Sequence, residues 1–294
     1  MFQRREQRYW SLFYLCGQLS DLERKTIEPM VLALIGPDPK VVRAVEHFIS
    51  QGRWETPALI LRYQELVAEW LGDAQGVVII DGSGFPKQGQ DSVGVAHQYC
   101  GALGKLANCQ EGVFAVYVGP SGYAFLDERL YVHADWFDEA HRERWKKCGI
   151  PAGLRFRTEP ELALDIVREL VERDRVPFKW VTFDEHFGES PSLLDEIDAL
   201  GKWYLAEVPC NTRAWLRTPR VEPPGPGLLG RPRTRRRLAK TAPRARELRD
   251  VAASLLQSAW ARYTFKEGSQ GPMVAEFAVL RVTTVRDKLP GPRV

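Results

Sequence analysis

Two short apolar runs, each ending in an aspartate, constrain the fold of this chain more than any other feature. The first run covers residues 76–81 and ends in Asp81, and the second covers residues 178–184 and ends in Asp184. Short apolar runs bounded by an acid are typical of buried strands, and open α/β sheets place functional groups at strand ends. We therefore expect both aspartates to lie at strand ends of one sheet.

The segments around these runs follow in the order strand, hairpin, helix, strand, helix, strand. Residues 111–119 and 123–132 read as strands, and Pro120-Ser121-Gly122 between them is a hairpin signal. Thr158 and Glu161 form a capping-box pattern ahead of apolar residues at helical spacing. A further helix is expected over 190–201 and a further strand over 203–208. This order predicts a mixed α/β layer with helices packed on a sheet.

The two ends of the chain differ from this central part. The N-terminal region has apolar residues at helical spacing, and a capping box at Ser20 and Glu23 predicts a helix start there. After residue 208 the character of the chain changes: residues 221–240 are too rich in Pro, Gly and Arg for a regular element, and residues 273–287 alternate like a strand. We expect a helical region over 1–73, an α/β core over 74–208 and a basic, β-rich, incomplete region over 209–294.

Positive charge is concentrated in the last region. Residues 213–249 hold 12 of the 41 Lys and Arg residues but only two of the 38 acidic ones, so the rest of the chain is net acidic. A basic block on an acidic body predicts a polyanionic partner, and its phosphate contacts would be independent of sequence and sensitive to salt. The alternative is a solvated linker that binds nothing.

Composition excludes several other classes of protein. No apolar run approaches the roughly 18–20 residues that span a bilayer, and no apolar segment follows the charged N-terminus as in a signal peptide. The five cysteines are widely spaced without a CxxC pair, which argues against a zinc ribbon or a disulfide framework. A cytoplasmic protein with reduced thiols is expected.

The two aspartates allow two interpretations. Carboxylates brought together at a sheet edge repel each other, and divalent cations, which prefer oxygen ligands, relieve that repulsion. Two Mg²⁺ ions roughly 3.5–4 Å apart would activate a water or a DNA 3′-hydroxyl for phosphodiester chemistry. An aspartate at a strand end also serves as a helix N-cap or a turn residue, and the pattern alone leaves both roles open.

One long segment resembles a known family. Residues 81–114 carry Asp-x-Ser-Gly-Phe-x-Lys-x-Gly, then Ser-Val-Gly-Val-x-x-Gln-Tyr, then Gly-x-x-Gly-Lys-x-x-Asn-Cys-Gln. This series resembles the segment after the first catalytic aspartate of insertion-sequence transposases of the DDE superfamily. Later blocks resemble the family in the same order, up to the tail that begins at Lys266.

The resemblance implies a ribonuclease-H-like core, a helical N-terminal region that contacts DNA, and a β-rich insertion. It implies that Asp81 and Asp184 are the first two catalytic, metal-binding carboxylates, with Mg²⁺ as the metal and Mn²⁺ as a substitute. Double-stranded DNA at transposon ends and targets would be the substrate, in the nucleoid, with another transposase copy as a partner. The DNA-contacting residues that we expect are basic: Lys87, Lys105, Arg231, Arg233, Arg235, Arg236, Arg237 and Lys240.

The family's third carboxylate is not found. The resemblance implies a glutamate on a helix after the insertion, in a Trp-x-Ile-Glu-like context, and residues 185–294 contain no such context. Glu207, Glu247 and Glu276 stand in different surroundings. We therefore expect a transposase truncated before its third carboxylate. Two alternatives stay open: a DNA-binding remnant or inhibitor without catalytic activity, and a decayed gene product that folds poorly.

Overall fold

The computed structural model of the chain describes residues 2, 4–52, 54–225, 234–269 and 271–294. Its centre is a six-stranded sheet. Five strands follow in the order β2-β3-β1-β5-β6, and the sixth strand, β4, also pairs with β3. The strands are β1 (Val77–Pro86), β2 (Ala96–Cys100), β3 (Lys105–Gly119), β4 (Gly122–Tyr131), β5 (Trp180–Phe183) and β6 (Trp203–Ala206).

The sheet is mixed. Strand β1 runs antiparallel to β3 and parallel to β5, and β6 continues the parallel part. The predicted hairpin is confirmed as β3–β4, with Gly122 in the turn at a φ of 145° that favours glycine. The α/β class expected from the sequence is confirmed, and the mixed sheet with flanking helices is consistent with a ribonuclease-H-like core.

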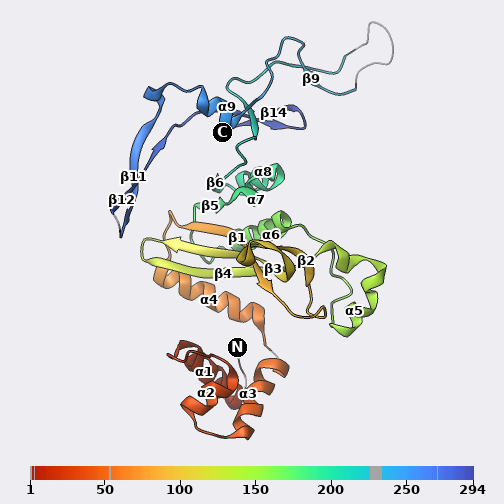
Figure 1. Cartoon of the computed structure of the whole chain (residues 1–294), viewed down its shortest axis with the longest axis vertical. Coiled ribbons are helices and arrows are strands. Elements are labelled where there is room, and N and C mark those ends of the chain that lie inside the picture. The colour runs from red at the N-terminus through yellow and green to blue at the C-terminus, as the bar shows by residue number, and fades with distance from the viewer. Residues whose placement is uncertain (1, 3, 53, 226–233, 270) are drawn as a thin grey trace.

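One face of this sheet is covered by three helices (Figure 1). They are α4 (Thr56–Leu71), α6 (Glu159–Arg173) and α8 (Pro191–Ala199). The predicted capping box of α6 is confirmed, because the Thr158 hydroxyl accepts the Glu161 N–H while the Glu161 carboxylate accepts the Thr158 N–H. The fully buried side chains of this core come from strands and helices alike: Val78, Ile80, Tyr117, Ile166, Leu170, Val181 and Ile197.

The other face of the sheet remains open over much of its area. Along β1, Val78 and Ile80 are buried whereas Ile79 and Asp81 are exposed, as the alternation of a strand requires. Exposed apolar side chains on neighbouring strands, Phe125 and Leu205 among them, extend this face. Asp81 thus emerges on the face that the helices leave free.

The N-terminal helices form a small core of their own around Phe13, Met30, Val31 and Val45. The predicted helix start at Ser20 is wrong, because the Ser20 hydroxyl donates to the Gly17 carbonyl at the end of the first helix. No helix in the described part of the chain is long and apolar enough to cross a membrane. The N-terminal helices are α1 (Arg5–Leu19), α2 (Ile27–Leu34) and α3 (Pro39–Gln51).

The C-terminal part holds a four-stranded sheet in the order β10-β7-β13-β14, a long hairpin β11–β12 and a short pair β8–β9. The single strand predicted over 273–287 is split between β12 and β13, and the Arg-rich tract, predicted to be irregular, contains β9. The strands are β7 (Arg213–Trp215), β8 (Val221–Glu222), β9 (Arg237–Leu238), β10 (Arg246–Glu247), β11 (Ala261–Gly268), β12 (Gly271–Phe277), β13 (Thr283–Arg286) and β14 (Leu289–Arg293). The remaining helices are short: α5 (Arg142–Lys147), α7 (Glu185–Gly188), α9 (Leu248–Ala253), and 3₁₀ turns at Gly101–Leu103, Ala134–Phe137, Glu139–His141 and Gln257–Ala259.

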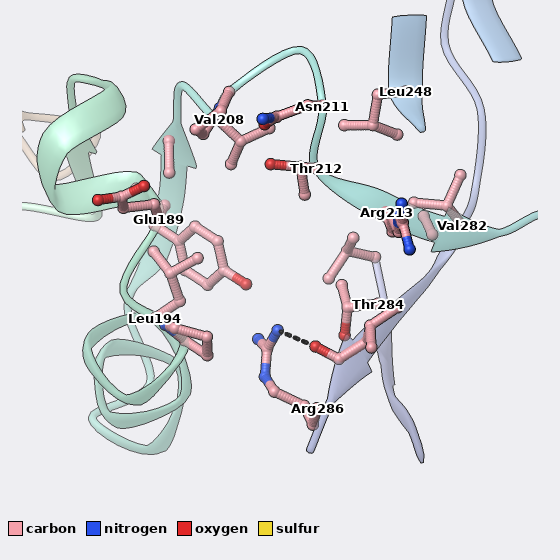
Figure 2. A pocket seen from close by; sticks show the side chains of 18 residues that line it. Glu189, Leu194, Val208, Asn211, Thr212, Arg213, Leu248, Val282, Thr284 and Arg286 are labelled. Atoms are coloured by element: carbon pink, nitrogen blue, oxygen red, sulfur yellow. Dashed lines mark hydrogen bonds between the residues drawn. The ribbon is translucent and has the colours of Figure 1, made fainter. Parts of the chain in front are cut away.

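A hollow of about 420 Å³ separates the central sheet from the C-terminal one (Figure 2). Leu194 and Val208 line its core side, and Val282 and Thr284 line the side of β13. At its edge Arg286 of β13 forms an ion pair with Asp195 of α8, with a nitrogen–oxygen distance of 3.0 Å. The hollow is mostly apolar and contains neither predicted catalytic aspartate.

Candidate active site

Two adjacent parallel strands bring the predicted catalytic aspartates together. Ile80 of β1 is paired with Phe183 of β5, so that the next residues in register are Asp81 and Asp184. Neighbouring strands in a sheet lie about 4.8 Å apart. Both aspartates line one hollow of about 540 Å³. The predicted strand end is confirmed for Asp184, which directly follows β5, but it is wrong for Asp81, because β1 continues to Pro86 through its pairing with β3.

Each aspartate is held by a backbone N–H. The Gly82 N–H donates to Asp81 Oδ1 over 2.8 Å, and the Phe187 N–H donates to Asp184 Oδ1 over 3.3 Å. Asp184 is the N-cap of α7, which is one of the two roles that the sequence left open. One oxygen of each carboxylate thus has a protein donor, and N-capping is compatible with a second role for the other oxygen.

Two glutamates that the sequence analysis did not single out enter the same hollow. Glu111 comes from β3, and Glu159 is the first residue of α6. They approach where Gly82 has no side chain: a Cβ built on Gly82 would lie 3.4 Å from Glu111 Oε1 and 3.6 Å from Glu159 Oε2. Both glutamates therefore lie within ordinary contact distance of the position that follows Asp81.

Glu111 is the most perturbed acid of the hollow. Its Oε2 atom is buried without a hydrogen-bond partner among the described residues, and a Cβ on Gly84 would lie 2.8 Å from it. Burial, with the nearby Glu159 and Asp81 carboxylates as smaller causes, raises the pKa of Glu111 to about 7. Around neutral pH, this side chain is partly protonated.

Glu159 is held by a histidine. His186 Nε2 lies 3.3 Å from Glu159 Oε2, and this contact joins the start of α6 to α7. Burial raises the pKa of Glu159, and Asp184 adds to that rise, whereas the contact with His186 opposes it. His186 thus partly offsets the negative charge of the hollow.

Replacing Glu111 by glutamine is expected to stabilise the protein at pH 8 but not at pH 5. The folded-state pKa of about 7 lies above the ordinary 4.5, so the folded protein keeps a proton that the unfolded chain loses as pH rises between these values. The free energy of unfolding of the wild type therefore falls by about 1–2 kcal/mol across this window, after allowance for solvent screening. Glutamine does not ionise, so the variant avoids this loss. The difference in unfolding temperature between variant and wild type is measured with EDTA at both pH values. The exposed Glu128→Gln is the control. Equal unfolding temperatures for Glu111→Gln and wild type at pH 8 would contradict this account.

The donors of the hollow suit a hard divalent cation. Asp81 and Asp184 offer carboxylate oxygens, the ligands that Mg²⁺ and Mn²⁺ prefer. Burial is the main cause of the raised pKa values of Glu111 and Glu159, and neighbouring carboxylates add to it, an effect that a bound cation would oppose. Within the described ranges, no group of three or more His, Cys, Asp or Glu side chains is arranged to hold a metal ion.

The other residues predicted near this site lie outside the hollow. Lys87 follows the end of β1 and Lys105 begins β3, and both are exposed. Asn108 and Gln110 are structural: the Asn108 amide donates to the Lys87 carbonyl over 2.8 Å, and the Gln110 amide donates to the Val93 carbonyl over 2.6 Å. These bonds fix the loop after β1 to β3.

Strand β9, which carries Arg237 of the predicted basic tract, lies at the opposite end of the molecule from the N-terminal helices (Figure 1). Arg235, Arg236 and Arg237 line one hollow there, whereas Lys240 is exposed outside it. Arg231 and Arg233 lie outside the described residues. The structure thus groups three of the predicted DNA-contacting residues.

Comparison with known proteins shows the family of the chain. Residues 1–272 match the model of the family described as DDE superfamily endonuclease. The chain is also 29% identical over 196 residues to a protein of Microchaete diplosiphon named as the probable transposase for insertion sequence element IS701. That match covers 66% of this chain and 47% of the relative, so the chain spans about half of the relative's length. On the family match across nearly its whole length, the chain belongs to the DDE superfamily endonucleases.

Proposed function

We propose that this chain cuts and joins double-stranded DNA at transposon ends, with Asp81 and Asp184 as the catalytic, metal-binding carboxylates. The observation that carries the proposal is that each aspartate directly follows the paired segments of two adjacent parallel strands, Val77–Ile80 of β1 and Trp180–Phe183 of β5. Family membership supports an endonuclease, and the named relative supports a transposase.

Asp81 and Asp184 would hold Mg²⁺, or Mn²⁺ in its place. When bound, the metal supplies activation of an attacking water or hydroxyl and stabilisation of the leaving oxygen. The protein's own part is orientation: the Gly82 and Phe187 N–H groups fix one oxygen of each aspartate. His186 fixes Glu159 and keeps part of the hollow's charge compensated.

A second candidate function is DNA binding without cleavage. It is favoured by the lack, among the described residues, of a third group arranged with the aspartates as a metal ligand. Action as an inhibitor of a full-length transposase belongs to this candidate. Residence at the nucleoid and pairing with another transposase copy are part of either proposal.

Incubation of the purified chain with a duplex that carries the terminal sequences flanking its gene tests the two candidates. The first predicts strand cleavage and joining with Mg²⁺ or Mn²⁺ and none with EDTA, because the carboxylate pair needs a cation to act on a phosphodiester. The second predicts a retarded protein–DNA complex and no product with either metal. Cleavage that continues unchanged in EDTA would contradict the metal assignment.

A further inference from the structure

A hollow of about 800 Å³ lies in the C-terminal part, between strand β9 and the turn that joins β13 to β14. Arg235, Arg236 and Arg237 line one wall, and Asp287 and Lys288 line the other. The two walls are about fifty residues apart in the sequence, so the fold assembles them. We call this hollow the basic groove.

The first wall is anchored at one residue. Arg237 pairs with Glu222 in the β8–β9 ladder, and its guanidinium also contacts the Glu222 carboxylate over 2.9 Å. Arg235 and Arg236 precede it directly and are exposed. In the described part of the chain, neither of these two forms an ion pair with an acidic side chain. The anchor therefore fixes the position of two charges that the protein itself leaves uncompensated.

The second wall is a strained turn. Arg286 pairs with Leu289, so that Asp287 and Lys288 form a two-residue hairpin loop, with φ values of 48° and 66°. Such a loop favours glycine at its second position, because a side chain there is unfavourable in the left-handed region. A lysine at that position fits the backbone poorly. Lys288 lines the hollow from this strained position, and strained residues are frequent at functional sites.

The first wall of the groove carries three arginines, and the second carries one cation, Lys288, beside the acid Asp287. Arg235, Arg236 and Lys288 are without an acidic partner among the described residues, and Arg237 shares its charge with Glu222. Asp287 is the one acid among the residues that line the groove. Cations that face each other across a hollow suit a chain of phosphates running between them, since each phosphate gains contacts from both sides.

We propose that the basic groove clamps the phosphate backbone of double-stranded DNA between Arg235, Arg236 and Lys288. The proposal rests on the proposed function for its choice of DNA as the polyanion. It adds a contact surface separate from the carboxylate hollow, and a residue, Lys288, from a hairpin outside the Arg-rich tract. Because the contacts are to phosphates, the groove positions the duplex without reading its sequence.

The test is DNA binding in EDTA, without cleavage. Fluorescence anisotropy with a labelled duplex of arbitrary sequence gives the affinity from about 50 to 200 mM salt. The variant Arg235→Gln/Arg236→Gln/Lys288→Gln is expected to lower the steepness of log K against log salt by about 2–3, since each lost phosphate contact removes about 0.9. The charge-matched control is Arg62→Gln/Arg168→Gln/Arg175→Gln, whose residues form ion pairs with Glu65 and Glu196 in the helical part of the core.

The variant Lys288→Gly removes the lysine side chain without straining the turn. Glycine suits the φ of 66°, so the variant is expected to unfold at the wild-type temperature or above it. It should nevertheless lower the salt slope by about 1. A merely structural role for Lys288 would instead leave DNA binding unchanged.

Three results would contradict the proposal that the basic groove binds DNA. They are a wild-type salt slope in the triple variant, an equal loss in the charge-matched control, and wild-type binding by Lys288→Gly. In each of these cases metal-dependent cleavage by the wild type would leave the proposed function standing. If the wild-type chain binds no duplex at all, both proposals fail together.

Discussion

Asp81→Asn and Asp184→Asn are each expected to lower Mg²⁺-dependent DNA cleavage by about 10²- to 10³-fold, the loss that follows when several kcal/mol of metal-borne stabilisation disappear. Asparagine keeps the size of the side chain and is itself a good N-cap, so α7 is expected to remain intact in Asp184→Asn. Cleavage rates under single-turnover conditions measure the effect. Asp198→Asn, on α8 outside the hollow, is the matched control.

Thermal unfolding supplies a readout that needs no DNA. A cation that binds the folded chain raises its unfolding temperature, so Mg²⁺ or Mn²⁺ should stabilise the wild type and Asp198→Asn. The same additions should have little effect on Asp81→Asn or Asp184→Asn, which lack one of the two carboxylates. If either variant keeps more than about a tenth of the wild-type cleavage rate, the assignment of that aspartate as a metal ligand is wrong.

The strands that carry the aspartates could be predicted because their signals are local. An apolar run ending in an acid needs no distant partner to be recognised, and the alternation along β1 places Asp81 on one face. The Thr158 capping box likewise lies within four residues and is confirmed. These elements depend on neighbours in the sequence, which a reader of the sequence can see.

Glu111 and Glu159 could not be predicted because their role depends on pairing. Glu111 reaches the hollow because β3 pairs Gly84 with Glu111, a register that no local pattern contains. The available signal was an acid at the start of the apolar run 111–119. Glu159 looked like an ordinary first-turn acid of a capped helix, and only the packing of α6 brings it to His186.

The helix start at Ser20 was wrong for a local reason that the sequence did contain. The helix begins at Ile27, and Pro29 therefore lies in its first turn, where the missing N–H costs nothing. A helix starting after Ser20 would place Pro29 in its interior and lose a hydrogen bond. The capping-box pattern takes no account of the hydrogen bond that a proline inside the helix would lose.

Gly188→Ala is expected to destabilise the protein by about 3 kcal/mol, at the upper end of what overpacking costs. A Cβ at Gly188 would overlap the carbonyl oxygen of Glu207, and this is backbone that cannot swing away like a side chain. Glu207 is also tied to the sheet, because its N–H donates to the Phe183 carbonyl over 3.1 Å. The clash therefore pushes α7 away from the end of β6.

The same substitution should also alter the geometry of the candidate active site. Gly188 ends the helix that Asp184 caps, so displacing α7 moves the Asp184 carboxylate relative to Asp81. We expect an unfolding temperature lower by about 5–10 °C together with weaker metal-induced stabilisation. Gly153→Ala is the control, since no atom lies within 4 Å of a Cβ there. If Gly188→Ala unfolds at the same temperature as Gly153→Ala, the close packing of α7 against the residues after β6 does not hold Asp184 in place.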